Sequence, residues 1–327
     1  MTTALVLAGA VAKGAYEAGV LAVLAQRNIE VRAIVATSAG ALNAALFATG
    51  LRHGRSSLAA ETLLSLWREE ATWTNIVRPT LRGLFEHTGL SSIDALEKIV
   101  QRGMDGIANA QLPDVKRPVN LKLITTSLNG ETRSERGVET TTFEHVMNFQ
   151  DSDFDTEQAR QPVARAALAS SAFPVLFVPV SLAGVGPCID GGAVNNTPIS
   201  WALESGADHV IVVTGTPLNA PSEPELKGLE LIGKEVDVAI NERLFRDLQQ
   251  ARSVNQKLAD LRAALAGLPL DDAQRDAVVG ALGWAPLAIT EIRPERPLRG
   301  NAFAALGDAQ LREEYIQAGR DAAERAL

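Results

Sequence analysis

The sequence predicts an α/β fold with parallel strand pairing. Two short apolar runs, residues 3–8 and 31–36, are each followed by residues with helical apolar spacing, at 15–26 and 39–48. The order strand, helix, strand, helix implies parallel pairing through a right-handed crossover. The continuous β-branched run at 210–213 is typical of a strand buried on both faces.

The third strand is predicted at residues 119–126, where another apolar run occurs. We expect Gly130 to end this strand and residues 139–143 to return beside it. Residues 150–162 are polar and acidic, which is typical of a surface loop. Later strands are predicted at 177–182 and 287–292.

Two helical regions interrupt this alternation. A helical excursion is predicted over residues from about 56 to 115, and a helical insertion over residues from about 225 to 284. Apolar spacing over 225–265 fits either one long helix or two broken ones, and we expect it to pack on the core. Further helices are predicted at 163–171, in 267–284 and at 308–327.

Length and composition indicate an ordinary globular protein. The chain has 327 residues and a formal net charge of −8, which argues against a nucleic-acid partner. Its single cysteine, Cys188, excludes an internal disulfide and favours a reducing compartment. No apolar run reaches the roughly 18 residues of a membrane span, and we see no signal peptide, so we expect a cytoplasmic protein. Without internal repeats or low-complexity linkers, residues 1–327 are expected to form one domain.

A serine stands at the turn between the second strand and the following helix. In the stretch Ala36-Thr37-Ser38-Ala39-Gly40, small residues flank Ser38, as a sharp turn requires. Such a turn exposes the hydroxyl beside the positive end of a helix, where a nucleophile is favoured. Serine alone is a weak nucleophile and needs an activating group. The alternative is that Ser38 merely caps the helix.

Two further patterns carry candidate chemistry. The loop Gly9-Ala10-Val11-Ala12-Lys13-Gly14 follows the first strand, so its N–H groups lie at a helix N-terminus and suit a phosphate or a developing oxyanion. The stretch Asp190-Gly191-Gly192 places a carboxylate before two residues that allow a tight turn. Taken alone, each also fits a plain strand connection or an Asx turn.

Together these blocks resemble the patatin-like phospholipase family. The resemblance continues through Lys13 to Leu21, through Ala169-Ser170-Ser171-Ala172-Phe173-Pro174, and through Asn195 and Pro198 after Asp190. The order and spacing of the blocks cover residues 4 to about 215. The joint pattern is far more specific than any of its parts.

The resemblance implies a three-layer α/β/α sandwich with a mostly parallel central sheet. It also implies a Ser–Asp dyad of Ser38 and Asp190, with the amides of residues 9–14 as the oxyanion hole and Ala36, Gly40, Gly191 and Gly192 in supporting positions. The reaction it implies is hydrolysis of lipid acyl esters, of the phospholipase A or lysophospholipase type, without a metal or cofactor. Phospholipid or lysophospholipid would be the substrate, with transient membrane contact.

The chain departs from the family pattern at three positions. Ala10 and Val11 stand where the family has glycines, and Ala36 replaces the first glycine of the serine turn. Val11 is β-branched and strained at positive φ. We therefore expect either a loop with negative φ only or a shifted oxyanion hole.

A catalytic histidine is not favoured by the sequence. Of the four histidines (His53, His87, His145 and His209), His209 comes closest in order to the histidine of α/β-hydrolases. It immediately precedes the strand at 210–213, so we expect it at the N-terminal edge of that strand, whereas sites in parallel sheets lie at the C-terminal edge. An aspartate base in turn needs shielding to raise its pKa above the usual 3.9 or so.

Two other readings of function remain open at this stage. The same acyl-enzyme would serve an acyltransferase, and the same fold would serve a non-catalytic lipid-binding protein.

The sequence also offers candidates for an entrance through which lipid reaches the site. Trp67, Trp73, Leu84 and Phe85 either form an apolar entrance or belong to the core of the helical excursion.

Overall fold

The computed structural model describes residues 2–76, 93–135, 137–174, 176–217, 229–282 and 287–327. Its centre is a mixed sheet in the order β5-β6-β3-β2-β1-β7-β8, with β4 paired to β3. The five adjacent strands β3, β2, β1, β7 and β8 are parallel to one another. Strands β4 and β6 run antiparallel to β3, and β5 runs antiparallel to β6. The prediction of a mostly parallel sheet is therefore confirmed. The strands are β1 (Thr3–Leu7), β2 (Ala33–Thr37), β3 (Asn120–Glu135), β4 (Val138–Gln150), β5 (Val180–Leu182), β6 (Gly186–Asp190), β7 (His209–Val213) and β8 (Ala288–Ile292).

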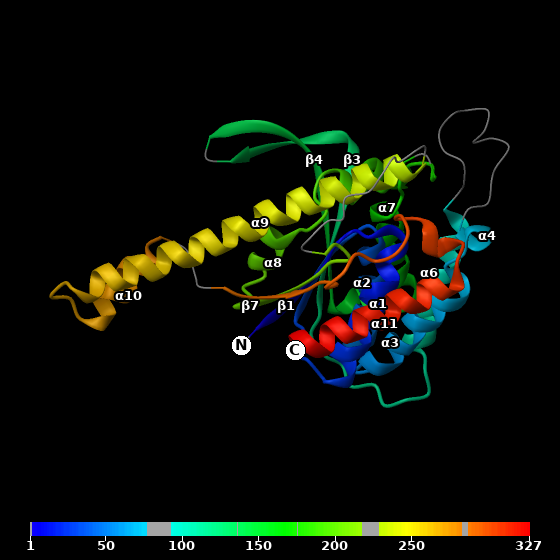
Figure 1. Ribbon diagram of the computed structural model, residues 1–327, viewed down its shortest axis with the longest axis horizontal. Helices are drawn as coiled ribbons and strands as arrows, with labels where there is room; N and C mark the ends of the chain where they lie inside the picture. The colour runs from blue at the N-terminus through cyan, green and yellow to red at the C-terminus, as the bar shows by residue number, and fades with distance from the viewer. Residues whose placement is uncertain (1, 77–92, 136, 175, 218–228, 283–286) are drawn as a thin grey trace.

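Helices cover both faces of the sheet (Figure 1). Leu5 and Leu7 of β1 point into a large apolar core shared with α1, α2, α7 and α11, whereas Ala4 and Val6 point into a second core shared with α8 and α9. This alternation along one strand produces the three layers that the resemblance implies. The helices are α1 (Gly14–Gln26), α2 (Ala39–Arg52), α7 (Glu157–Ser170), α8 (Ile199–Leu203), α9 (Leu229–Ala266) and α11 (Ala309–Ala326).

Both predicted helical regions contain helices among their described residues. The first contains α3 (Ser56–Ser65), a π-helical turn η2 (Leu66–Glu70), α4 (Trp73–Ile76) and α6 (Asp94–Ala108). The second is α9, a single helix of 38 residues, against whose end α10 (Asp272–Gly280) packs through a small apolar cluster. Figure 1 shows the distal part of α9 and α10 projecting beyond the sheet. The alternative of two broken helices is therefore wrong.

Two other expectations are corrected by the structure. Gly130 does not end β3: it adopts a φ of +67° within a shift of register between Thr126 and Glu131, so the strand bulges there and continues. Residues 150–162 are not a loop, because a short 3₁₀ turn, η3 (Asp151–Phe154), leads directly into α7. The hydroxyl of Thr156 accepts a hydrogen bond from the Ala159 amide and so caps this polar first turn.

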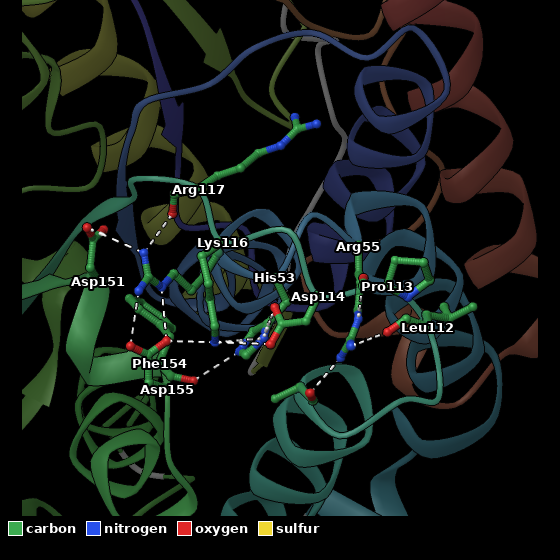
Figure 2. Close-up of polar contacts among 12 residues, drawn as sticks. His53, Arg55, Leu112, Pro113, Asp114, Lys116, Arg117, Asp151, Phe154 and Asp155 are labelled. Atoms are coloured by element: carbon green, nitrogen blue, oxygen red, sulfur yellow. Dashed lines mark hydrogen bonds and ion pairs between the residues drawn. The ribbon is translucent and has the colours of Figure 1, made fainter.

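A polar network anchors the C-terminal end of α2 (Figure 2). Arg52 makes two hydrogen bonds of 3.0 Å to the carboxylate of Asp155, and the His53 ring lies 3.0 Å from the carboxylate of Asp114. The Arg55 guanidinium donates to four backbone carbonyls at the end of α6 and in the segment after it. These contacts fix the helix whose other end carries Ser38.

Candidate active site

The ends of two strands meet beside β3, and this junction brings Ser38 and Asp190 together. Strand β2 ends at Thr37, which pairs with Ile124, and Ser38 is the next residue. Strand β6 approaches from the opposite direction and ends at Asp190, which pairs with Thr125. Because Ile124 and Thr125 are consecutive, residues 152 positions apart in the sequence become neighbours.

Ser38 occupies a strained turn between β2 and α2. Its φ of 56° and ψ of −131° lie outside the regions that a residue with a Cβ normally adopts. The Ser38 amide donates a 2.9 Å hydrogen bond to the hydroxyl of Ser170, which in turn donates to the carbonyl of Ile124. The hydroxyl of Thr37 donates to the carbonyl of Asn195 at 2.9 Å. The turn is thus held from both sides by buried hydrogen bonds.

The Ser38 hydroxyl donates a hydrogen bond of 2.6 Å to Oδ2 of Asp190. The other carboxylate oxygen, Oδ1, accepts from the Gly192 amide at 2.7 Å. Both side chains are buried, with 5% of each residue exposed. Burial raises the pKa of Asp190 to about 6, although the hydrogen bonds from Ser38 and Gly192 act to lower it. This carboxylate is therefore a stronger base than a solvated aspartate and is still mostly ionised at neutral pH.

The backbone around Asp190 is fixed independently of the side chain. Its amide donates to the carbonyl of Ala172, and its carbonyl accepts from the hydroxyl of Thr126. Gly191 lies so close to β3 that an added Cβ would approach the Ile124 carbonyl oxygen within 2.1 Å. A side chain at residue 191 would therefore push the carboxylate away from Ser38.

The loop of residues 9–14 lies beside Ser38, with η1 (Val11–Lys13) as its second half. Val11 adopts a φ of +46°, so the first of the two alternatives for this loop, negative φ only, is wrong. Hydrogen bonds on either side impose this conformation: the Gly9 amide donates to the Asn196 carbonyl, and the Ala12 amide donates to the Ala302 carbonyl. Val11 and Ala12 line the same cavity as Ser38.

Most amides of this loop are already paired. Those of Gly9, Ala12, Lys13 and Gly14 all donate to backbone carbonyls. Within the part of the chain that the structure describes, the amides of Ala10 and Val11 have no hydrogen-bond partner. These two N–H groups are therefore available to donate hydrogen bonds to a bound group.

The supporting residues predicted from the sequence pack tightly around the turn. Ala36 is fully buried between Leu7 of β1 and Leu123 of β3, so its methyl group is accommodated in the core. An added Cβ on Gly40 would approach the Leu7 carbonyl oxygen within 2.7 Å. Helix α2 therefore begins in direct contact with the end of β1.

An apolar cavity opens beside Ser38. Its walls come from α2, α3, η2, α6 and the segment after α7, and the space open to the centre of a water molecule is about 110 Å³. Trp67, in the π-helical turn, lines this cavity, and its ring lies against Gly14. Trp73 instead stacks on Phe303. Leu84 and Phe85, the other two residues of the predicted entrance, lie outside the described residues.

The described histidines lie away from this junction. His209 is the first residue of β7 and pairs with Thr3, so it lies at the opposite edge of the sheet from Ser38, as predicted. His53 lies at the far end of α2, and the His145 ring contacts the carboxylate of Glu131 on the β3–β4 hairpin. His87 lies outside the described residues. Among the described residues, no group of three or more His, Cys, Asp or Glu side chains is placed to hold a metal ion.

Sequence reasoning missed three residues that shape the site. Ser170 lies in the stretch 169–174 that contributes to the family resemblance, but the sequence indicates no role for its side chain. Asn196 donates through Nδ2 to the Gly9 carbonyl at 3.1 Å and so joins the loop of Gly9 to the segment after Asp190. Asn43 accepts from the Trp67 indole at 2.8 Å and donates to Glu17 at 2.9 Å. Burial raises the pKa of the Glu17 carboxyl group well above its usual value.

A family model described as "Patatin-like phospholipase" matches residues 5–203. No curated protein matches the chain significantly. In the part of the chain that the structure describes, no helix has the length and apolarity to cross a bilayer.

Several solved structures are similar to this chain. VipD from Legionella pneumophila is 14% identical, with a TM-score of 0.41 over 99% of this chain and 66% of VipD. The type III effector protein ExoU is 16% identical, with a TM-score of 0.34 over 86% of this chain and 62% of ExoU. ExoU in its complex with SpcU, from Pseudomonas aeruginosa, is 17% identical, with a TM-score of 0.30 over 86% of this chain and 59% of that one. The chain thus spans less than two thirds of the length of these proteins.

Proposed function

Because the chain belongs to the patatin-like phospholipase family, whose members hydrolyse lipid acyl esters, we propose that it is a serine acyl-ester hydrolase with Ser38 and Asp190 as its dyad. The observation that carries the proposal is the 2.6 Å hydrogen bond between these two side chains at the wall of an apolar cavity. The substrate class is a phospholipid or lysophospholipid, whose acyl chain suits such a cavity.

In the proposed first step, the Ser38 hydroxyl attacks the acyl carbonyl while its proton passes to Oδ2 of Asp190. The carbonyl oxygen gains negative charge, which the amides of Ala10 and Val11 stabilise. The tetrahedral intermediate then collapses, the ester bond breaks, and the proton on Asp190 passes to the departing alcohol. The product of this step is an acyl group esterified to Ser38.

In the second step, water replaces the alcohol. Asp190 accepts a proton from this water as it attacks the acyl-enzyme, and the same two amides stabilise the second oxyanion. The proton on Asp190 then returns to Ser38 as the fatty acid leaves. Asp190 accepts or donates the proton in each of these transfers. Burial raises its pKa to about 6, and a pKa close to neutral pH favours both roles.

Hydrolysis of p-nitrophenyl butyrate tests this proposal. We expect a burst of p-nitrophenol that matches the enzyme concentration, followed by slower turnover if deacylation limits the rate. Ser38→Ala and Asp190→Asn should each lower kcat/KM by at least about a thousandfold. Ser200→Ala, which changes an exposed serine on α8, is the matched control and should keep full activity.

Turnover retained in Ser38→Ala would remove Ser38 from the reaction. A wild-type protein that binds lipid but cleaves no ester would be a binding protein on this fold. Addition of glycerol or a lysolipid acceptor separates the remaining reading, because an acyltransferase would divert the acyl group from water to that acceptor.

A further inference from the structure

We propose that the apolar cavity beside Ser38 accepts one acyl chain of about ten carbons, and that Leu46 and Leu66 form the floor that sets this length. The proposal rests on the proposed function, since it takes the ester carbonyl to lie at Ser38. It goes further by assigning the residues that determine which acyl chains are cleaved.

The cavity follows one face of α2 away from Ser38. Ser38, Leu42 and Leu46 all line it, and they recur at the four-residue spacing that places side chains on one face of a helix. Eight residues separate the first from the last, which corresponds to about 12 Å at 1.5 Å per residue. Leu51, one and a half turns farther along α2, is buried in the core and is not part of the cavity wall.

Helix α6 closes the distal end of the cavity. Leu96, Ile99 and Val100 line the wall, but Gly103 in the next turn does not. An added Cβ on Gly103 would lie 2.8 Å from Cδ2 of Leu46 and 3.3 Å from Cδ1 of Leu66. The tips of these two leucines therefore lie directly against the α6 backbone, where α2, η2 and α6 meet.

The wall offers little to a polar head group. Asn43 lines the cavity, but its amide nitrogen already donates to the Gly14 carbonyl and to Glu17, and its oxygen accepts from Trp67. The other α2 residues of the lining between Ser38 and Leu46 are apolar. Glu70 and Ser171 also line the cavity, but the Glu70 carboxylate accepts from Arg102 and the Ser171 hydroxyl donates to the Ala167 carbonyl. The acyl chain, rather than the head group, is thus the part of the substrate that this space fits.

The length and the width of the cavity together determine which acyl chain fits it. An extended polypeptide spans about 3.3–3.6 Å per residue, which contains three backbone bonds, so an extended chain advances about 1.2 Å per bond. A cavity about 12 Å long therefore holds an acyl chain of about ten carbons. The volume open to a water-sized group is about 110 Å³, which spread over that length admits one alkyl chain and not two side by side.

The test is the chain-length profile of p-nitrophenyl esters from C4 to C16 in Triton X-100 mixed micelles. The wild-type protein should show its highest kcat/KM between about C8 and C12. Leu46→Ala removes the floor and should raise the ratio of C16 to C10 activity at least about tenfold. Gly103→Ala adds a methyl group behind the same leucines, pushes their tips into the cavity and should move the optimum to shorter esters.

Two controls keep the test decisive. Leu51→Ala makes the same truncation on the same helix outside the cavity, and it should leave the profile unchanged. If Leu46→Ala does not fold, Leu46→Val makes a smaller opening and should shift the profile in the same direction.

Failure of this inference differs from failure of the proposed function. Cleavage of esters with a profile that neither Leu46→Ala nor Gly103→Ala changes would overturn the floor assignment and leave the dyad intact. No cleavage of any ester by the wild-type protein would overturn the proposed function itself.

Discussion

The hydroxyl of Ser170 accepts a hydrogen bond from the backbone amide of Ser38, although 132 residues separate them in the sequence. Both groups are buried, and the Ser170 hydroxyl itself donates a hydrogen bond to the Ile124 carbonyl. The last residue of α7 is thereby tied to the strained turn and to the strand beside it. This arrangement holds the Ser38 side chain toward Asp190.

Ser170→Ala should lower kcat by about 10–100-fold with little change in KM, because the Ser38 amide loses its acceptor and the turn relaxes. A buried N–H without a partner costs about 1–3 kcal/mol. Thr49→Ala is the matched control, since it removes a buried hydroxyl that donates to the Ala45 carbonyl within α2. Steady-state kinetics on both variants check this, and equal kcat in Ser170→Ala and wild type would show that the bond does not position Ser38.

Gly9→Ala should abolish activity and lower the free energy of unfolding by about 1–3 kcal/mol. An added methyl group would lie 2.1 Å from Oδ1 of Asn196 and 2.9 Å from Cβ of Ser38, so the loop or the turn must shift. Gly106→Ala, on the exposed side of α6 with no atom within 4 Å of the new Cβ, should be neutral or stabilising by up to about 1 kcal/mol. Urea unfolding and ester hydrolysis of the two variants distinguish a close-contact effect from a general effect of added methyl groups.

Val11→Gly should raise Tm. A β-branched residue at a φ of +46° carries strain of about 1–2 kcal/mol, which glycine does not. Val11→Ala is the comparison, because it shortens the side chain but keeps a Cβ at positive φ. A gain in Tm for alanine equal to that for glycine would show that the side chain, and not the backbone, is strained.

The pH dependence of kcat/KM should show an acid limb with an apparent pKa of about 6. Burial raises the pKa of Asp190 from its usual value, so the carboxylate is protonated as pH falls through this range and no longer accepts the Ser38 proton. Activity is therefore lost on the acid side and retained on the neutral side. A flat profile down to pH 4 would contradict Asp190 as the base.

Much of the fold could be predicted from local patterns. The apolar runs located β1, β2, β7 and β8 within a few residues, and the order of strands and helices indicated the parallel sheet. The extent of β3 could not be predicted, because glycine usually ends a strand, whereas the left-handed φ of Gly130 produces a bulge whose pairing with β4 resumes beyond it. That outcome depends on the partner strand and not on the local sequence.

The candidate site, like the fold, could be predicted only where local sequence determines it. Ser38 and Asp190 stand out because each lies at a turn with small neighbours, and the joint pattern linked them. Ser170 and Asn196 carry no such local signature, since their hydrogen bonds join segments that meet only after the sheet has formed. The positive φ of Val11 could not be predicted either, because hydrogen bonds from Gly9 and Ala12 to distant carbonyls impose it.

Covalent labelling with a fluorophosphonate, followed by mass spectrometry of the modified peptide, tests the central claim most directly. The phosphonyl group reports a serine that an adjacent base and oxyanion donors activate. We expect a single label on Ser38, a rate of labelling that falls below pH 6 or so with Asp190 protonation, and no label in Asp190→Asn. Labelling of another serine, or of none while esters are still cleaved, would contradict the dyad.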